Sequence, residues 1–156
     1  MRRSDREITD TEEKLAILDK CKVCRLGLSV NNDLYIVPLN FGYTFANNAL
    51  TLYFHSAQEG KKIDMLRANP HVCFELDTGH DLVHGDTACT YSFRYASLIG
   101  SGRVSFIDSR EEKVYALNAL MRHQTGQNRD LAFNDADLDQ VLVYKLVVSE
   151  MSGKQH

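Results

Sequence analysis

Apolar and polar residues alternate along most of the chain, and this pattern predicts strands more often than helices. Residues 25–30 and 34–41 are rich in apolar side chains, and Asn31-Asn32-Asp33 between them predicts a tight hairpin turn. Asn47-Asn48 similarly separates the continuation of the second strand from a third strand over residues 49–55. Together these segments predict a three-stranded meander.

Three further segments have the composition of strands. Residues 71–76 predict a fourth strand, which a polar stretch over 77–87 follows. Residues 91–107 predict a long strand, in which Gly100 and Gly102 indicate a bulge or the close approach of another backbone. The segment 141–148 is too apolar to lie exposed, so we expect it to close the sheet centrally.

Helices are predicted at three points between these strands. The capping-box pattern at residues 9–12 precedes an amphipathic segment that reaches about residue 20. A second helix is predicted over about 60–69, before Pro70. A third begins after a capping box at residues 109–112, packs on the sheet through one apolar stripe and ends before Gly126.

About six strands, mostly joined by short turns, predict a mainly β fold: an antiparallel β-barrel with inserted helices. Alternating βαβ units are absent from the pattern. A chain of 156 residues without an internal linker or repeat is expected to form a single domain over residues 1–156.

Composition excludes several classes of function. A hydrophobic content of 44% is sufficient for a packed core, and a net charge of -3 with a pI near 6.0 argues against nucleic acid as a partner. No apolar run approaches the roughly 20 residues of a membrane span, and the polar amino terminus lacks the apolar core of a signal peptide. We therefore expect a cytoplasmic protein without a membrane segment.

The cysteines are expected to be thiols in a reducing compartment, because a domain of this size does not need disulfides. Cys21 and Cys24 match a CxxC pattern, which by itself is a weak signal for a metal or redox site. A zinc ion would need further ligands to complete four, and the available side chains are Cys73, Cys89, His80 and His84. We expect no metal site.

Residues 52–62 carry the clearest functional signal. An alternating strand ends at His55 and Ser56, and the helix start that follows contains Lys61 and Lys62. Free backbone N–H groups, the positive end of the helix, a hydroxyl and two lysines would therefore converge, which suits a bound phosphate. Two adjacent lysines are more often a solvated surface pair, but cations at a helix N-terminus are unfavourable without an anion.

A second set of candidate residues lies on the strand over 91–103. Its alternation gives two dissimilar faces, and its aromatic and hydroxyl groups beside glycines are suited to line a flat ligand. The alternative is a strand whose faces divide between core and solvent. An apolar face around Leu98 and Ile99 is expected to be covered by a second subunit.

The chain resembles the pyridoxamine 5'-phosphate oxidase-like FMN-binding split-barrel superfamily, in particular its nitroimidazole-resistance (Nim) branch. The matching elements are residues 35–43, residues 54–57 with 60–64, and residues 93–102, and their order and spacing agree. Authentic pyridoxamine phosphate oxidases carry a further C-terminal segment with arginine and histidine groups, whereas this chain stops at residue 156. Oxidation of pyridoxamine phosphate is therefore not expected.

The resemblance implies a six-stranded split barrel that binds FMN at a homodimer interface. It places Lys61 and Lys62 toward the phosphate and the backbone of residues 55–57 along the cofactor. If the protein is an oxidoreductase, the imidazole of His55 is the candidate proton donor, although a histidine at a strand end is more often a packed or capping group. At the position of Arg94 the family has a basic or aromatic residue, and the resemblance does not assign a role to it. The cofactor-binding residues that it implies are Val37, Pro38, Leu39, Asn40, Phe54, His55, Ser56, Ala57, Lys61 and Lys62, with Tyr95, Ser97, Leu98 and Ile99 contributed by the second subunit.

The leading interpretation is a flavin-dependent oxidoreductase in which FMN passes electrons to a small organic acceptor such as a nitroaromatic compound. The alternative is a non-catalytic flavin-binding or redox-sensing module, which keeps the phosphate site and lacks a substrate cavity. A third interpretation, a haem-binding split barrel, would need an axial ligand, for which the candidates are His71, His80, His84 and His123.

Overall fold

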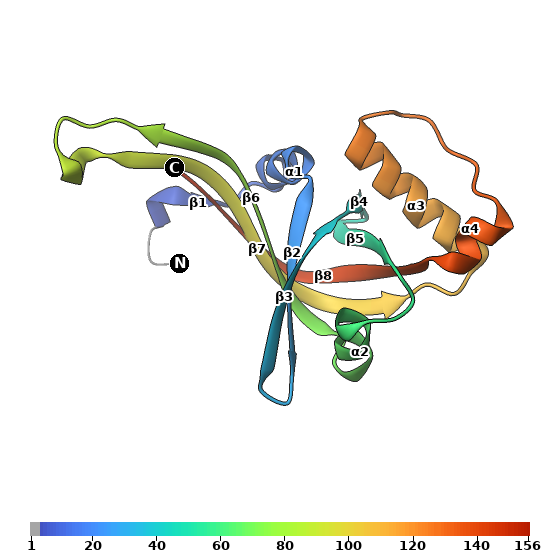
Figure 1. Cartoon of the computed structure of the whole chain (residues 1–156). Helices are drawn as coiled ribbons and strands as arrows, with labels where there is room; N and C mark the ends of the chain where they lie inside the picture. Colours follow the sequence, from blue (N-terminus) through green and yellow to red (C-terminus); the bar gives the residue numbers. More distant parts are fainter. Residues whose placement is uncertain (1–3) are drawn as a thin grey trace.

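One antiparallel sheet forms most of the molecule in a computed structural model that describes residues 4–156 (Figure 1). The sheet has eight strands, seven of them in the order β3-β2-β6-β7-β8-β5-β4, and β1 pairs with β8. The strands are β1 (Glu7–Ile8), β2 (Val23–Val30), β3 (Asp33–Asn40), β4 (Gly42–Ala46), β5 (Ala49–Ser56), β6 (His71–Val83), β7 (Ser92–Phe106) and β8 (Leu142–Gln155).

The helices lie between the strands in the sequence. They are α1 (Thr11–Lys20), α2 (Lys61–Ala68), α3 (Arg110–Thr125) and α4 (Asp135–Gln140), with short 3-10 turns at Ser4–Arg6 and Ala88–Thr90. The predicted class, a mainly β antiparallel fold with inserted helices, is confirmed, although the sheet has eight strands where six were predicted. No helix in the described part of the chain has the length and apolar character needed to cross a membrane. The polar amino terminus that argued against a signal peptide lies partly outside the described residues, which omit 1–3.

Both predicted asparagine turns form hairpins. Asn31 and Asn32 have φ values of 49° and 68°, and Asn47 and Asn48 have 52° and 61°. Two consecutive positive φ values match the right-handed twist of the flanking strands, and asparagine tolerates them better than most residues. The turns join β2 to β3 and β4 to β5.

The predicted meander is wrong, because β3 and β4 lie at opposite ends of the strand order. The chain changes direction at Phe41, whose side chain is completely buried. At Gly42, any Cβ would collide with the backbone of Leu120 in α3, so only glycine allows β4 to lie this close to the helix. One apolar run in the sequence therefore becomes two strands that serve different parts of the sheet.

Strand β6 extends beyond its predicted end at residue 76, as far as Val83. Its second half pairs with the beginning of β7, where Leu82 lies opposite Phe93, and the two strands form the arm that projects at the left of Figure 1. This part of β6 could not be predicted because its residues are mostly polar. On an exposed arm neither face of a strand requires apolar side chains.

Capping residues explain where the helices begin and end. Ser109 accepts a hydrogen bond from the N–H of Glu112 and Gly126 ends α3 with φ 70°, both as predicted. For α1 the cap is Asp10, which accepts from Glu13, rather than the predicted Thr9. The short helix α4 was not predicted; six residues with one buried apolar side chain, Leu138, show no helical period.

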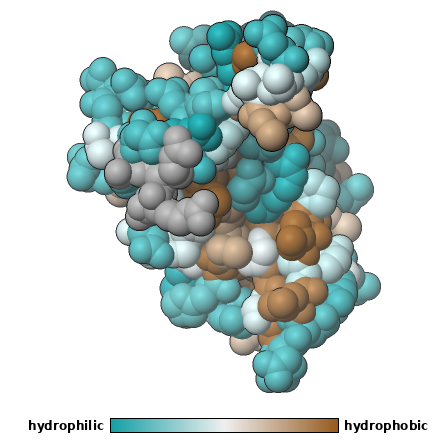
Figure 2. All heavy atoms as spheres, turned by 90° about the vertical axis from the view of Figure 1, so that its left-hand side faces the viewer, coloured by the Kyte–Doolittle hydropathy of each residue, from teal (hydrophilic) through white to brown (hydrophobic). Residues whose placement is uncertain are grey.

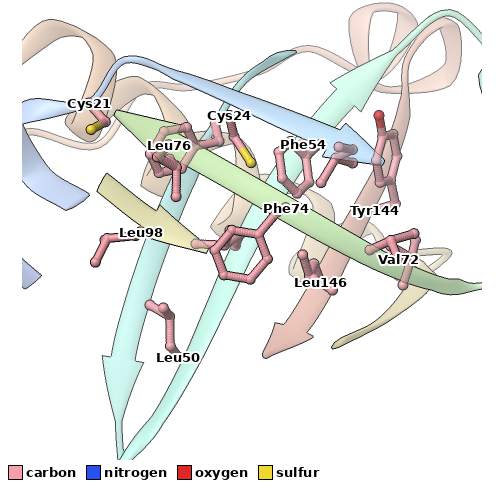
Figure 3. Packing of buried hydrophobic residues seen from close by; sticks show 14 of the residues in the cluster. Cys21, Cys24, Leu50, Phe54, Val72, Phe74, Leu76, Leu98, Tyr144 and Leu146 are labelled. Carbon is pink, nitrogen blue, oxygen red and sulfur yellow. The ribbon is translucent and has the colours of Figure 1, made fainter. Parts of the chain in front are cut away.

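The inner face of the sheet holds the main core (Figure 3). Phe54 stacks on Tyr144 at a centroid distance of 5.5 Å, and the hydroxyl of Tyr144 is buried without a hydrogen-bond partner among the described residues. The two predicted glycine positions are confirmed as close approaches: a Cβ at Gly100 would lie 2.5 Å from the carbonyl oxygen of Glu150, and the β7–β8 register shifts at Gly102.

A buried histidine joins α3 to the connection between α1 and β2. The side chain of His123 is 3% exposed, and its Nε2 lies 2.8 Å from the carbonyl oxygen of Cys21. Its Nδ1 lies 3.7 Å from Asp19, beyond hydrogen-bond distance. Burial lowers the pKa of His123, with the charge of Lys22 acting in the same direction.

This burial predicts a loss of stability in acid. The pKa of His123 is lower in the folded state than the ordinary value of about 6.5, so the unfolded chain binds more protons below that pH. The stabilising contribution is complete above about pH 6.5 and is lost as the pH falls through the folded-state pKa. In urea unfolding between about pH 7.5 and 5, His123→Gln should weaken the decline of the free energy of unfolding. His84→Gln, at an exposed histidine, should keep the wild-type decline, and an unchanged pH dependence in His123→Gln would contradict the assignment.

Candidate functional site

The junction between β5 and α2 presents unpaired backbone amides. Strand β5 ends at Ser56, which pairs with Leu142, and α2 begins at Lys61. Gly60 precedes the helix with φ 129° and ψ 164°, a conformation that favours glycine. Its carbonyl accepts from Ile63 N–H at 2.8 Å, and within residues 4–156 no side chain caps this helix start. The positive end of α2 is therefore available to an anion.

Lys61 is already engaged by groups of β3. Its Nζ lies 2.9 Å from Asp33 and 5.1 Å from the ring centroid of Tyr35. These contacts bring the beginning of β3 next to the beginning of α2. They also direct the ammonium of Lys61 toward a carboxylate, so the two lysines do not share one environment.

Lys62 faces the other side of the helix start. It is half-buried, and in the described part of the chain its ammonium has no salt-bridge partner. Burial lowers its pKa, and its charge is close enough to His55 to lower the pKa of that imidazole. A half-buried cation at an uncapped helix start is unfavourable unless an anion accompanies it.

His55 lies on the outer face of β5. Its side chain shares this face with Tyr53 and meets α3 and α4. The His55 side chain is exposed, but its partial desolvation against α3 and α4 lowers its pKa, and the charge of Lys62 lowers it further. Both effects favour the neutral imidazole, in which one nitrogen donates a hydrogen bond and one accepts.

Ser56 and Phe54 lie on the inner face of the same strand. The Ser56 hydroxyl donates to the carbonyl oxygen of Ala57 at 2.8 Å. The side chain of Phe54 is 1% exposed and belongs to the core, so only its backbone can contact a ligand. His55 therefore lies on the opposite face of β5 from Phe54 and Ser56. The loop from Ala57 to Gly60 leads from the end of this strand to the start of α2.

The candidate residues of β3 alternate between the two faces of the strand. Val37 and Leu39 pack partly against the core, whereas Pro38 and Asn40 are exposed. The amide nitrogen of Asn40 donates to the carbonyl oxygen of Lys22 at 3.0 Å, which fixes the end of the strand. Backbone atoms are therefore the groups that this segment most readily offers to a ligand.

The candidate residues of β7 do not join the β5–α2 junction within one chain. The first part of β7 belongs to the projecting arm, and Figure 1 shows it on the opposite side of the molecule from α2. Tyr95 lies below the ammonium of Lys154 at 5.7 Å, and Ser97 is half-buried. Ile99 is 55% exposed, but Leu98 is fully buried, so the prediction of an apolar surface that includes Leu98 is wrong.

The metal-ligand candidates are dispersed. Within residues 4–156 no three side chains of His, Cys, Asp or Glu come together as a metal site. Cys21 and Cys24 are buried free thiols, Cys73 and Cys89 are exposed ones, and burial raises the pKa of Cys21 to about 11. A thiol with so high a pKa is a poor nucleophile at pH 7.

The haem-ligand candidates each contact another group. The nearest contacts are His71 with Arg103 at 3.0 Å, His80 with Asp77 at 2.5 Å, His84 with the ring of Tyr91, and His123 with the carbonyl of Cys21. His123 also lines a cavity of about 620 Å³, together with Tyr43 and Ala119.

Sequence reasoning missed the residues that shape this junction. Asp33 and Tyr35 engage Lys61, and Gln58 donates to the carbonyl oxygen of Asp139 at 2.5 Å. Asp33 directly follows a hairpin turn and Tyr35 lies in the strand after it, and neither position carries a sequence signal for contact with α2. The Gln58 contact joins positions 81 residues apart, for which no local sequence signal exists.

Comparison with known proteins adds a family and several similar structures. A family model described as pyridoxamine 5'-phosphate oxidase matches residues 10–155. A solved structure from Bacteroides thetaiotaomicron, described as a 5-nitroimidazole antibiotic resistance protein, is 37% identical, with 96% of this chain and 86% of that chain covered and a TM-score of 0.82. No curated protein matches significantly.

More distant structures share the fold. A flavocytochrome from Azotobacter vinelandii is 20% identical over 100% of this chain and 72% of that chain, with a TM-score of 0.80. A FAD- and haem-binding protein from Mycobacterium smegmatis is 20% identical over 96% of this chain and 73% of that chain, with a TM-score of 0.81. The family resemblance, which three segments between residues 35 and 102 indicated, therefore extends over residues 10–155.

Proposed function

We propose that this chain, which belongs to the pyridoxamine 5'-phosphate oxidase family, binds the FMN moiety of a flavin and acts as an oxidoreductase on small organic acceptors. The uncapped start of α2 beside half-buried Lys62 is the observation that carries this proposal. A flavin phosphate supplies the anion that this arrangement needs.

The residues of the β5–α2 junction fit a phosphate group. Lys62 and the first amides of α2 bind it, and the hydroxyl of Ser56 donates to it after turning from the carbonyl of Ala57. Backbone atoms over residues 37–40 and 55–57 lie along the remainder of the FMN moiety. Lys61 holds β3 in place through Asp33 and contributes mainly its backbone amide.

A homodimer would complete the site with residues of β7. On the outer face, the paired residues Pro38, Arg25, Glu75, Ile99 and Ser152 form one row across five strands. Leu34 and Ile36, 76% and 69% exposed, lie on the same face of β3 as Pro38. Apolar side chains also reach the surface among hydrophilic ones on the face seen in Figure 2. Isologous contact between two such surfaces buries them, so the flavin-bound protein should sediment as a dimer at micromolar concentration, and a monomer would contradict the proposal.

Reduction of a nitro group is the reaction that we propose. When bound, a reduced flavin would supply two electrons, and with two protons these convert a nitro group into a nitroso group and water. The imidazole of His55 can pass one of these protons from solvent to the acceptor, because it takes up a proton on one ring nitrogen as it donates from the other. The similar Bacteroides protein is described as a resistance protein for 5-nitroimidazoles, which supports a nitro compound as the acceptor class.

The lysines provide a matched test of the phosphate site. Lys62→Ala should weaken FMN binding roughly tenfold to a hundredfold, because a hydrogen bond to a charged group contributes about 1.5–3 kcal/mol. Lys61→Ala should have a smaller effect, since Asp33 already pairs with that ammonium. The measurement is fluorescence titration of the apoprotein with FMN. Equal affinity of wild type and Lys62→Ala would remove the phosphate assignment.

Electron transfer tests the oxidoreductase proposal. Photoreduced flavin in this protein should reduce a nitroaromatic acceptor faster than free reduced FMN does, as followed by anaerobic stopped-flow absorbance. His55→Ala should slow the transfer and leave FMN affinity largely unchanged, whereas His84→Ala should alter neither. Rates no higher than those of free flavin across several acceptors would instead favour a non-catalytic flavin-binding module.

A further inference from the structure

Tyr144 carries an unpaired hydroxyl into the core close to the end of β5. Its side chain is completely buried, and within residues 4–156 its hydroxyl has no hydrogen-bond partner. In water this group would both donate and accept hydrogen bonds, so its burial without a partner is costly. Phenylalanine would fill the same space without that cost. The hydroxyl itself therefore requires an explanation.

Aromatic neighbours fix the position of this hydroxyl. The ring of Tyr144 stacks on Phe54 at a centroid distance of 5.5 Å and meets Phe106 edge-on at 5.9 Å. Both neighbours pair directly with Tyr144 on adjacent strands, Phe54 on β5 and Phe106 on β7. In Figure 3 the hydroxyl points away from Val72 and Leu146. A closely packed ring cannot carry its hydroxyl to a distant acceptor, so a partner has to come to it.

Ser56 is the polar side chain placed to become that partner. Phe54 lies directly opposite Tyr144, and Ser56 follows two residues later on the same face of β5. Diagonal positions of this kind are about 7–8 Å apart, within reach of an aromatic side chain. Burial has the larger influence on the pKa of Tyr144 and raises it, but the Ser56 hydroxyl is near enough to lower it. The two hydroxyls are not hydrogen-bonded, and Ser56 donates instead to the carbonyl oxygen of Ala57.

Resting on the proposed flavin function, we infer that Tyr144 is a positioning residue for the phosphate site: its hydroxyl donates to Ser56 Oγ when Ser56 donates to a phosphate oxygen. A serine hydroxyl has one proton and two lone pairs, so it can accept and donate at the same time. When Ser56 turns from the carbonyl of Ala57 to the phosphate, its oxygen accepts the hydrogen bond that Tyr144 offers. The two hydrogen bonds strengthen each other, since they form a chain that ends on an anion. Phosphate binding thereby pairs a hydroxyl that is unpaired in the free protein.

This arrangement predicts that Tyr144→Phe has opposite effects on stability and on binding. In the free protein the substitution removes an unpaired hydroxyl, so the midpoint of urea unfolding should stay the same or rise. In the complex it removes a hydrogen bond, so FMN affinity, measured by fluorescence titration of the apoprotein, should fall about threefold to tenfold. A purely structural role of the hydroxyl predicts a lower unfolding midpoint, and that result would overturn the inference.

A double-mutant cycle with Ser56→Ala distinguishes positioning of Ser56 from a general disturbance of the core. Ser56→Ala should itself weaken FMN binding. In that background Tyr144→Phe should cause no further loss of affinity, because the acceptor of the Tyr144 hydrogen bond is already absent. A loss that persists in the Ser56→Ala background would contradict the inference.

Tyr53→Phe is the matched control. Tyr53 is also buried on β5, but it lies on the outer face, where its hydroxyl is 3.2 Å from that of Thr44 and where His55 lines a cavity of about 310 Å³. This substitution should leave FMN affinity unchanged, and an equal loss in Tyr53→Phe and Tyr144→Phe would overturn the inference. Wild-type affinity in Tyr144→Phe would also overturn it and leave the proposed function intact. Failure of FMN to bind the wild type would instead remove the proposed function and the inference with it.

Discussion

The pairing of β8 with both β5 and β7 is the constraint on which the other features depend. Residues Leu142 to Val147 pair with β5, and most of β8 also pairs with β7, so this strand joins the two parts of the sheet. Gly100 and Gly102 allow the close approach, because a Cβ at either position would collide with the backbone of β8. This pairing fixes the end of β5, and the end of β5 fixes the start of α2. The anion site that we propose is therefore set by the sheet rather than by a flexible loop.

The same connection creates the two environments on either side of β5. The chain between β7 and β8 forms α3 and α4, which cover the outer face where His55 lies. The inner face carries Phe54 into the core beside Tyr144, and Ser56 lies half-buried on the same face at the end of the strand. Because successive side chains of a strand point to opposite faces of the sheet, neighbouring residues of β5 have different surroundings. The outer face has partial burial, a nearby lysine and a cavity, whereas the inner face has close packing.

Much of the fold could be predicted from local sequence because local chemistry decides it. The two asparagine pairs adopt positive φ values, Ser109 and Gly126 bound α3, and the apolar segment at 141–148 belongs to a central strand. The second half of β6 and the break at Phe41 could not be predicted, because a partner strand and the backbone of α3 determine them. Such contacts join distant residues, and a single sequence contains no direct signal of them.

The candidate site was predictable to a similar degree. The signal for the β5–α2 junction is local, since a strand end, a glycine and two lysines follow one another in the sequence. The different environments of Lys61 and Lys62 depend on Asp33, which a hairpin brings from another strand. The burial of Leu98 follows from which face of β7 meets the core, and alternation alone leaves that choice open.

Binding of FMN compared with riboflavin tests the central claim most directly, because the two ligands differ only in the phosphate. Titration of the 15N-labelled apoprotein by NMR measures affinity and the position of contact together. An anion site at the start of α2 predicts much tighter binding of FMN, with large shifts of the Lys61 and Lys62 amide signals that riboflavin does not produce. Equal affinity for the two ligands, or FMN binding that leaves these amides unchanged, would contradict the claim.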